Sequence, residues 1–211
     1  MTTARLLLLA LTTALLSACA STTIRNSWID GTDQGGPPKK LAVFVAVTDD
    51  EVRRVAEDLT ARSLPPEVGA VPAHTLGLDT KLEEKALRDK LAPMGFDAAL
   101  VARLVSDDTT EQYIPPQTQF MPDPLFVGLR PYHRSFYAYY PVAYTYTTPG
   151  YTATTRRVIV DTVFYRLPEG KPVWSALTET VDPDSSVQVV EELIDKLGAE
   201  MRLHGLLPPA K

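Results

Sequence analysis

The chain has 211 residues, 45% of them hydrophobic, and carries 21 Lys and Arg against 26 Asp and Glu, a formal net charge of −5. This length suits one domain with a hydrophobic core. The acidic balance argues against nucleic-acid binding and against a polybasic contact with anionic lipid. With one cysteine in the chain, an intramolecular disulfide is excluded.

The N-terminus has the layout of a bacterial lipoprotein signal. A short basic start precedes an unbroken run of Leu, Ala and Thr at residues 6–16. This run is shorter than the roughly 20 residues of a membrane-spanning helix, so it indicates a secretory signal. The tetrapeptide Leu-Ser-Ala-Cys that ends at Cys19 resembles a lipobox. We therefore expect residues 1–18 to be a signal peptide and Cys19 to be lipidated; the alternative is an ordinary signal with a chance cysteine.

Lipidation at Cys19 would place the protein on a bilayer. In the lipoproteins that the segment resembles, the cysteine sulfur carries a diacylglycerol and the new amine is acylated. Each buried methylene contributes about 0.8 kcal/mol, so two or three chains anchor stably. Ala20 follows the cysteine, and by analogy with lipoprotein sorting a residue other than Asp there favours the periplasmic face of the outer membrane.

The next segments give a tether and the start of a domain. Residues 19–40 are polar and rich in Gly and Pro, which is typical of a tether. Residues 41–47 form an apolar run, which predicts a strand buried on both faces. A helix capped by Thr48, with Glu51 completing a capping box, follows. Its expected buried face is Val52, Val55, Ala56 and Leu59, and its expected solvent face is Arg53, Arg54, Glu57 and Asp58.

Six further elements complete the predicted domain. A short strand is predicted at residues 68–71 and a buried strand at 96–105. Between them, a helix is predicted from Asp79 or Thr80 to Gly95, with a buried stripe of Leu87, Leu91 and Met94. Residues 155–167 and 172–181 predict a hairpin around a turn at 168–171. A last helix begins at Asp182 or Asp184 and ends at Gly205, burying Val187, Val190, Leu193, Ile194, Leu197 and Met201.

This order, β-α-β-α-β-β-β-α, predicts a single α/β domain over residues 41–206, with residues 207–211 as a tail. We expect a mixed sheet of about five strands, parallel in its first half and closed by the antiparallel hairpin.

Residues 107–154 form a tyrosine- and proline-rich insertion between predicted strands. Eight of the nine tyrosines fall in it, and connections of this length are usually functional or disordered. It could fold back over the domain's own sheet. Alternatively it presents an exposed surface to a protein or glycan partner, because Tyr offers a large rigid face with a polar tip. The possible partner-binding residues are Tyr132, Tyr137, Tyr139, Tyr140, Tyr144 and Tyr146.

No constellation of reactive residues emerges from the sequence. His74, His133 and His204 are isolated, without metal-ligand spacing. The acidic pairs Asp49-Asp50 and Asp182/Asp184 stand at predicted helix starts, where carboxylates cap free N–H groups. A third pair is Asp107-Asp108. We therefore expect no catalytic residue, no metal and no cofactor.

Several segments together resemble a family of bacterial envelope lipoproteins known as a domain of unknown function. They are Ser27-Trp28-Ile29-Asp30, residues 41–59, residues 95–101 and Gly170-Lys171-Pro172-Val173-Trp174-Ser175. The resemblance implies an α/β domain similar to the TolB amino-terminal domain and to lipoprotein activators of peptidoglycan synthases. Such relatives bind envelope proteins and offer no catalytic residues to carry over.

The leading hypothesis is a non-enzymatic lipoprotein of the outer membrane, held by acylated Cys19, whose domain docks on an envelope protein. The first alternative is a small-ligand-binding or enzymatic domain with its site at the strand ends, between the turns at Val47-Thr48 and Val105-Ser106. The second is a structural subunit whose tyrosine segments pair edge to edge. The oligomeric state is left open.

Overall fold

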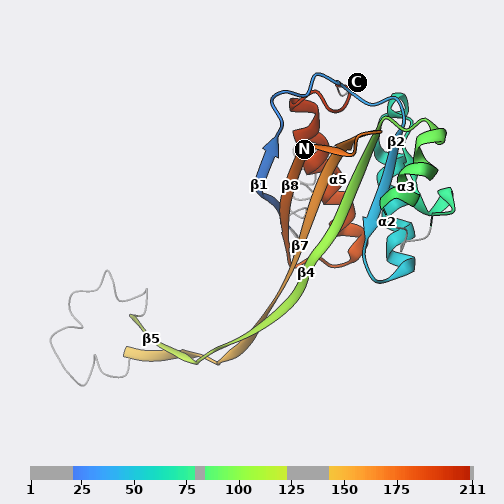
Figure 1. Ribbon diagram of the computed structural model, residues 1–211. Helices are drawn as coiled ribbons and strands as arrows, with labels where there is room; N and C mark the ends of the chain where they lie inside the picture. Colours follow the sequence, from blue (N-terminus) through green and yellow to red (C-terminus); the bar gives the residue numbers. More distant parts are fainter. Residues whose placement is uncertain (1–20, 79–83, 123–142, 210–211) are drawn as a thin grey trace, which may run out of the picture. The chain divides into compact units, whose positions relative to one another are not determined.

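The computed structural model describes residues 21–78, 84–122 and 143–209 (Figure 1). The chain divides into two compact units, which we describe separately: a main unit, up to residue 108 and from 156 onward, and a second unit, residues 109–155. The α-helices of the main unit are α2 (Asp50–Ser63), α3 (Glu84–Leu91) and α5 (Ser186–Leu203).

Six strands form one mixed sheet in the order β1-β8-β7-β4-β2-β3. They are β1 (Ser21–Ile29), β2 (Leu41–Ala46), β3 (Val71–Pro72), β4 (Ala98–Ile114), β7 (Tyr151–Arg166) and β8 (Lys171–Val181). β2 pairs in parallel with β3 and β4, whereas β8 pairs antiparallel with β1 and β7. The expected α/β class and mixed sheet are confirmed, with one strand more than predicted.

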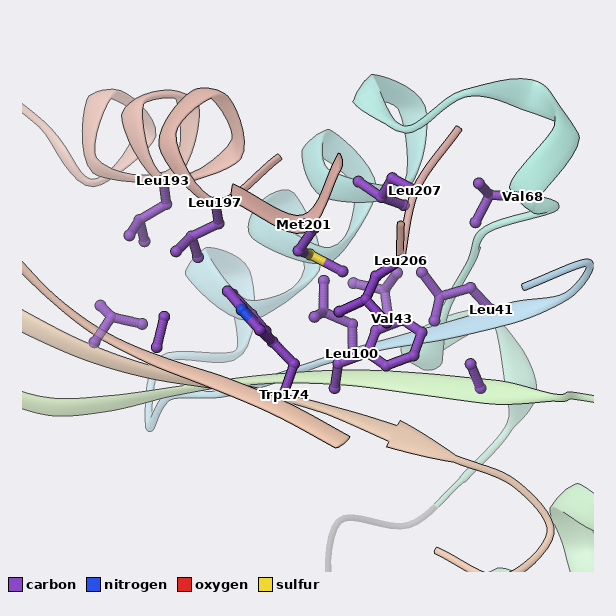
Figure 2. Close-up of a cluster of buried hydrophobic side chains, with 14 of the residues drawn as sticks. Leu41, Val43, Val68, Leu100, Trp174, Leu193, Leu197, Met201, Leu206 and Leu207 are labelled. Carbon is purple, nitrogen blue, oxygen red and sulfur yellow. The ribbon is translucent and has the colours of Figure 1, made fainter. Parts of the chain in front are cut away.

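The main core lies between one face of this sheet and the helices α2 and α5. Figure 2 shows Leu41 and Val43 of β2 in the same cluster as α5 side chains. Trp174 of β8 is fully buried there. The α5 side chains in this cluster are Val189, Leu193, Leu197 and Met201.

A second, smaller core lies on the opposite face, against α3. Successive strand residues point to opposite faces, so Ala42, between Leu41 and Val43, belongs to this second cluster. It packs with Leu91 of α3, Phe96 and Ala99. Helices therefore cover both faces of β2, which explains the unbroken apolar run in the sequence.

The tether predicted for residues 19–40 is contradicted where the structure describes it. Residues 21–29 form β1, which pairs along β8 from Ser21 opposite Val181 to Ile29 opposite Trp174. Thr22 is buried, and its backbone N–H and its hydroxyl both donate to Glu192 Oε2, at 2.9 Å and 2.7 Å. The polar groups of Thr22 are thus satisfied by α5 and not by water.

The glycine-rich part of the predicted tether is also docked. Arg166 of β7 donates from Nη2 to Asp33 Oδ2 at 2.8 Å and to the carbonyl of Gly36 at 2.6 Å. Lys171 Nζ lies 2.5 Å from Asp30 Oδ2. These contacts lower the pKa of Asp30, through the hydrogen bond from Lys171 first, and the pKa of Asp33, through the hydrogen bond from Arg166 first.

Two helices begin one or more residues later than predicted. Asp49, not Thr48, caps α2, because its side chain accepts from the N–H groups of Glu51 and Val52 at 2.9 Å and 3.0 Å. Ser185, not Asp182 or Asp184, caps α5 by accepting from Gln188 N at 3.1 Å.

Some predicted buried faces are wrong. Val55 and Val187 are 41% and 43% exposed, whereas Glu57 of α2, expected in water, is 1% exposed. In β4, only the first residues are buried, and Leu104 and Val105 are 37% and 50% exposed. The predicted start of the helix that contains α3, at residues 79–80, lies outside the described residues. Met94, which was predicted in the buried stripe of this helix, is exposed.

The second unit contains an antiparallel pair of strands. β5 (Gln117–Pro122) pairs with β6 (Ala143–Thr148), from Gln117 opposite Thr148 to Pro122 opposite Ala143. Strands β4 and β7 also have residues in this unit. Residues 107–114 and 151–154 are therefore strand, and the predicted insertion is shorter than 107–154.

Candidate functional site

The parallel strands β2 and β4 run toward the same edge of the sheet, and a hollow lies there on each face. Residues 41–46 of β2 pair in register with residues 98–103 of β4. Val45, Val47 and Leu104 line both hollows. Ligands of open α/β sheets bind at the carboxyl ends of the strands, so we consider both hollows. We name the one on the α3 face the groove and the one under α2 and α5 the cavity.

The groove has a volume of about 1130 Å³. Lys40 Nζ lies 4.8 Å from the centroid of the Phe96 ring and donates to the carbonyl of Met94 at 2.7 Å, which holds this ring at the wall of the groove. Most of the lining is apolar and comes from β2, α3, β4, β7 and the residues that flank β4 and β7: Phe44, Leu87, Leu91, Phe96, Val101, Tyr165 and Leu167.

Charged side chains from α2, α3 and the β7–β8 turn also line the groove: Asp50, Arg53, Arg88 and Glu169. Arg53 donates to Asp50 from both Nε and Nη2, and its Nη1 lies 3.5 Å from Glu57 Oε1. The hydrogen bond from Arg53 is the main cause of the lowered pKa of Asp50. Arg53 is therefore neutralised by carboxylates of its own helix.

The cavity has a volume of about 320 Å³ and lies inside the main unit, between the sheet and the two helices α2 and α5. Val45, Leu100, Val158 and Val160 supply apolar lining from the sheet. The helices contribute Val52, Ala56, Thr60 and Leu64 from α2, and Val189, Val190, Leu193, Ile194, Leu197, Gly198 and Met201 from α5.

Polar residues line the solvent-facing end of the cavity. They include Asp49, Asp107 and Ser186, which are exposed, and Arg156. Arg156 makes a two-point contact with Asp107, with Nε to Oδ1 at 2.8 Å and Nη2 to Oδ2 at 2.6 Å. This hydrogen bonding lowers the pKa of Asp107 and raises the pKa of Arg156.

Members of the predicted acidic pairs each have a structural role. Asp49 caps α2. Asp107 pairs with Arg156, and Asp182 Oδ1 accepts from the backbone N–H of that same arginine at 2.7 Å. Asp107 thus binds the side chain of Arg156, and Asp182 binds its backbone. The sequence did not indicate this arrangement, because the three residues are far apart in it.

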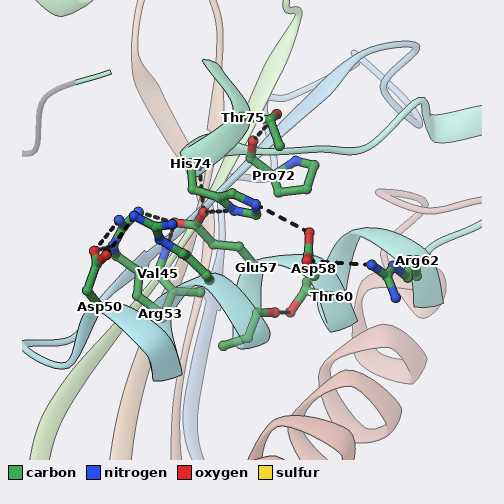
Figure 3. Close-up of polar contacts among 12 residues, drawn as sticks. Val45, Asp50, Arg53, Glu57, Asp58, Thr60, Arg62, Pro72, His74 and Thr75 are labelled. Carbon is green, nitrogen blue, oxygen red and sulfur yellow. Dashed lines mark hydrogen bonds and ion pairs between the residues drawn. The ribbon is translucent and has the colours of Figure 1, made fainter. Parts of the chain in front are cut away.

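A buried polar network lies beside the groove, at the edge of β2 (Figure 3). Glu57 Oε2 accepts from His74 at 2.8 Å through the backbone N–H, and Nδ1 of the same imidazole lies 2.9 Å away. Glu57 Oε1 accepts from the N–H of Val45 at 3.2 Å. The other ring nitrogen of His74 lies 3.6 Å from Asp58 Oδ1.

This network is best explained as a seal on a strand edge. β3 pairs with β2 only opposite Ala42 and Val43 and ends at Pro72, which has no N–H. The N–H of Val45 would otherwise have no partner on that side, and a buried unpaired N–H is costly. Glu57 was missed by sequence analysis because its neighbours Arg53, Arg54 and Asp58 give it the pattern of a solvent face.

Most of the predicted site residues fall outside the described part of the chain. These are Cys19, Tyr132, Tyr137, Tyr139, Tyr140 and also His133. Tyr144 and Tyr146 lie in β6, but their side chains are outside the described part. Two further tyrosines of the same segment are described, Tyr113 and Tyr151, and they are 65% and 55% exposed.

The remaining features give no further site. His204 follows the last turn of α5, and its Nε2 lies 3.8 Å from Glu200 Oε1. Across residues 21–78, 84–122 and 143–209, no group of three or more His, Cys, Asp or Glu side chains is placed to hold a metal ion. No helix in that part of the chain has the length and apolar character that crossing a membrane requires.

Comparisons with known proteins give only distant likenesses. No protein-family model and no curated protein matches the chain. Among solved structures, two crystal forms of the PelC dodecamer from Paraburkholderia phytofirmans match at 13% identity over 90% of this chain and 99% of theirs, with TM-scores of 0.44 and 0.43. A PDZ domain protein from Parabacteroides distasonis matches at 8% identity over 95% of this chain and 39% of its own, with a TM-score of 0.31. Likenesses at this level give no information on function or assembly.

Proposed function

We propose that the protein is a non-enzymatic lipoprotein, anchored through Cys19 to the periplasmic face of the outer membrane, that binds an envelope protein in the groove. The observation that supports docking is the groove itself, about 1130 Å³ with a largely apolar lining. Apolar grooves of this kind accept the apolar face of a helix from a partner.

The partner segment that fits is an amphipathic helix with basic flanks. Asp50 and Glu169 line the groove as acids. Arg53 and Arg88 line it as bases, and Arg53 and Asp50 pair with each other, so the preference for a basic partner rests on the charge of the whole chain. The whole chain has a formal net charge of −5, which attracts a basic partner and raises its rate of association.

A photo-crosslinking amino acid at Leu87, in the groove wall on α3, tests the docking site in living cells. The matched control is the same amino acid at Leu203, which is 83% exposed at the end of α5 and does not line the groove. We expect a discrete adduct from position 87 and none from 203. Sequencing of the adduct should identify an amphipathic helix with Lys or Arg at its ends.

Two results would overturn the docking proposal: equal adducts from both positions, or an adduct from position 87 that contains no such helix. The variant Leu87→Glu sharpens the test, because a charge in the apolar wall should abolish crosslinking from a second groove position, Leu91. Its thermal unfolding would be compared with that of Leu203→Glu to exclude a folding defect.

The anchor has a separate test. Mass spectrometry of the native N-terminus should find Cys19 as the first residue with its acyl groups, and the variant Cys19→Ser should leave the outer-membrane fraction. An unmodified thiol in an uncleaved precursor would contradict lipidation. Docking in the groove would survive that result, because the crosslinking test does not depend on the anchor.

A further inference from the structure

The packing between α2, α5 and the sheet leaves more space than a close-packed interior contains. Protein interiors have few voids larger than one water molecule, whereas this cavity measures about 320 Å³. That space accommodates roughly ten groups the size of a water or a methylene, each taking about 30 Å³. The walls are apolar side chains from three strands and two helices, so the occupant must be apolar over most of its length.

One polar atom in the wall has no partner. Thr162 of β7 lines the cavity and is 1% exposed, and its hydroxyl finds no hydrogen-bond partner among the described residues. Thr178 on the adjacent strand is equally buried but donates its hydroxyl to the carbonyl of Val160 at 3.0 Å. This hydroxyl has almost no surface open to a water-sized molecule, so it does not select the occupant of the cavity.

The residues at the solvent-facing end of the cavity indicate which polar groups the occupant should carry. Asp49, Asp107, Arg156 and Ser186 lie there, and two of these residues form the Asp107–Arg156 ion pair. The residues of this end comprise two acids and one base. A molecule with an apolar tail inside and a hydroxyl-bearing or zwitterionic head group outside meets both environments, whereas a bare anion would face an acidic entrance.

We propose that the cavity binds a single acyl chain of an ester- or amide-linked lipid, with the chain among the apolar walls and the head group between Asp107, Arg156 and Ser186 at the solvent-facing end. This site is separate from the groove and independent of the docking function. The proposal concerns binding only and involves no covalent step.

The acyl chain has two possible sources. One is a membrane lipid. The other is the protein's own anchor, because Cys19 precedes Ser21 by two residues, and Ser21 lies in the sheet opposite Val181, which pairs in turn with Arg157. β1 therefore begins at the end of the sheet where Arg156 borders the cavity.

A cavity-filling substitution tests the proposal. Gly198 of α5 lines the cavity, and a Cβ there would meet only Arg202, at 3.5 Å or more. We expect Gly198→Leu to fold and to weaken binding of decanoyl-lysophosphatidylethanolamine by roughly tenfold or more, because the new side chain occupies the space of the tail. The matched control is Ala199→Leu, at the adjacent exposed position of the same helix, which should bind like the wild type.

The measurement is titration calorimetry on the lipidated protein in nanodiscs and on the full-length variant Cys19→Ser exported with an ordinary signal peptide. Binding by both forms identifies a membrane lipid as the occupant. Binding by Cys19→Ser alone identifies the protein's own acyl chain. Absence of binding by both forms overturns the proposal, and so does equal affinity in Gly198→Leu and Ala199→Leu.

Thermal unfolding of Gly198→Leu and Ala199→Leu shows whether both variants fold.

Discussion

At the scale of single residues, Glu57 is a buried acid with several polar contacts. Its two carboxylate oxygens serve the N–H of Val45 and the N–H and ring of His74. Only 1% of its surface is exposed, so three fixed hydrogen-bond donors replace the water that would otherwise solvate its carboxylate. Such a group stabilises the fold only while every partner is present.

Removing this carboxylate should be strongly destabilising. We expect Glu57→Ala to lower the free energy of unfolding by about 3–5 kcal/mol, because buried N–H groups and the imidazole of His74 lose their partner. The control is Asp58→Ala, the neighbouring acid with a 35% exposed side chain, which should cost less than about 1 kcal/mol. Urea unfolding measures the free energy of unfolding of both variants. Equal losses of stability would show that Glu57 does not seal the edge of the strand.

The two buried threonines of β7 and β8 should respond oppositely to the same substitution. Thr178→Val removes the hydrogen bond to Val160 and should cost about 1 kcal/mol. Thr162→Val removes a hydroxyl without a partner among the described residues and should be neutral or stabilising. Denaturant unfolding of the lipid-free protein compares them, and a loss at Thr162 as large as that at Thr178 would reveal a partner for its hydroxyl.

At the scale of elements, the segment that follows β1 is held by ion pairs, of which Arg166–Asp33 is the better shielded from solvent. Arg166 and Asp33 have side chains only 14% and 15% exposed, and Arg166 also lies over the Phe164 ring, 5.3 Å from its centroid. These contacts dock residues 30–36 against β7. They also make the docking sensitive to acid, because Asp33 must stay ionised.

The pH dependence follows from the lowered pKa of Asp33. A carboxyl whose pKa is lower in the folded than in the unfolded protein stabilises the fold above the unfolded value, 3.8, and loses this effect as the pH falls through the folded value. Arg166→Met should therefore cost roughly 1–3 kcal/mol at neutral pH, and the difference from the wild type should shrink once the pH falls below about 4.

The control for this substitution is Arg62→Met on α2, where the arginine side chain is 78% exposed and the loss should be near zero at every pH. Guanidinium titrations at several pH values measure both variants. A cost of Arg166→Met that stays constant down to about pH 2 would mean that the packing of Arg166 on Phe164, and not its charge, holds the segment.

At the scale of the whole molecule, the second unit decides between two hypotheses for the tyrosine-rich segment. β5 and β6 pair up to Pro122 opposite Ala143, so Asn-Gly in place of residues 123–142 would close them as a two-residue hairpin. If the segment serves a partner, this variant should keep the unfolding midpoint and the slope of the wild type. If it covers the sheet of the main unit, the midpoint should fall and cooperativity should weaken.

Much of the main unit could be predicted from local patterns. The apolar run at 41–47, the 3.6-residue spacing in α5 and the turn at 168–171 depend on residues close in sequence, and each gave the element that the structure contains. The N-terminal signal is equally local, and it remains a prediction. The sequence indicated that a site could lie at the ends of the parallel strands. It did not indicate the volumes of the two hollows there or the residues that line them.

The rest depends on contacts between distant residues. Residues 21–29 pair with β8, and Thr22 also joins Glu192, 170 residues away, so distant contacts make a strand of a segment with the composition of a tether. Glu57 is buried because β3 ends at Pro72 and leaves an N–H of β2 to be satisfied. The sequence by itself therefore determined the periodic elements and their order, since neighbours along the chain set them. The tertiary structure alone decided which polar groups are buried and where space is left, because both depend on how separate elements meet.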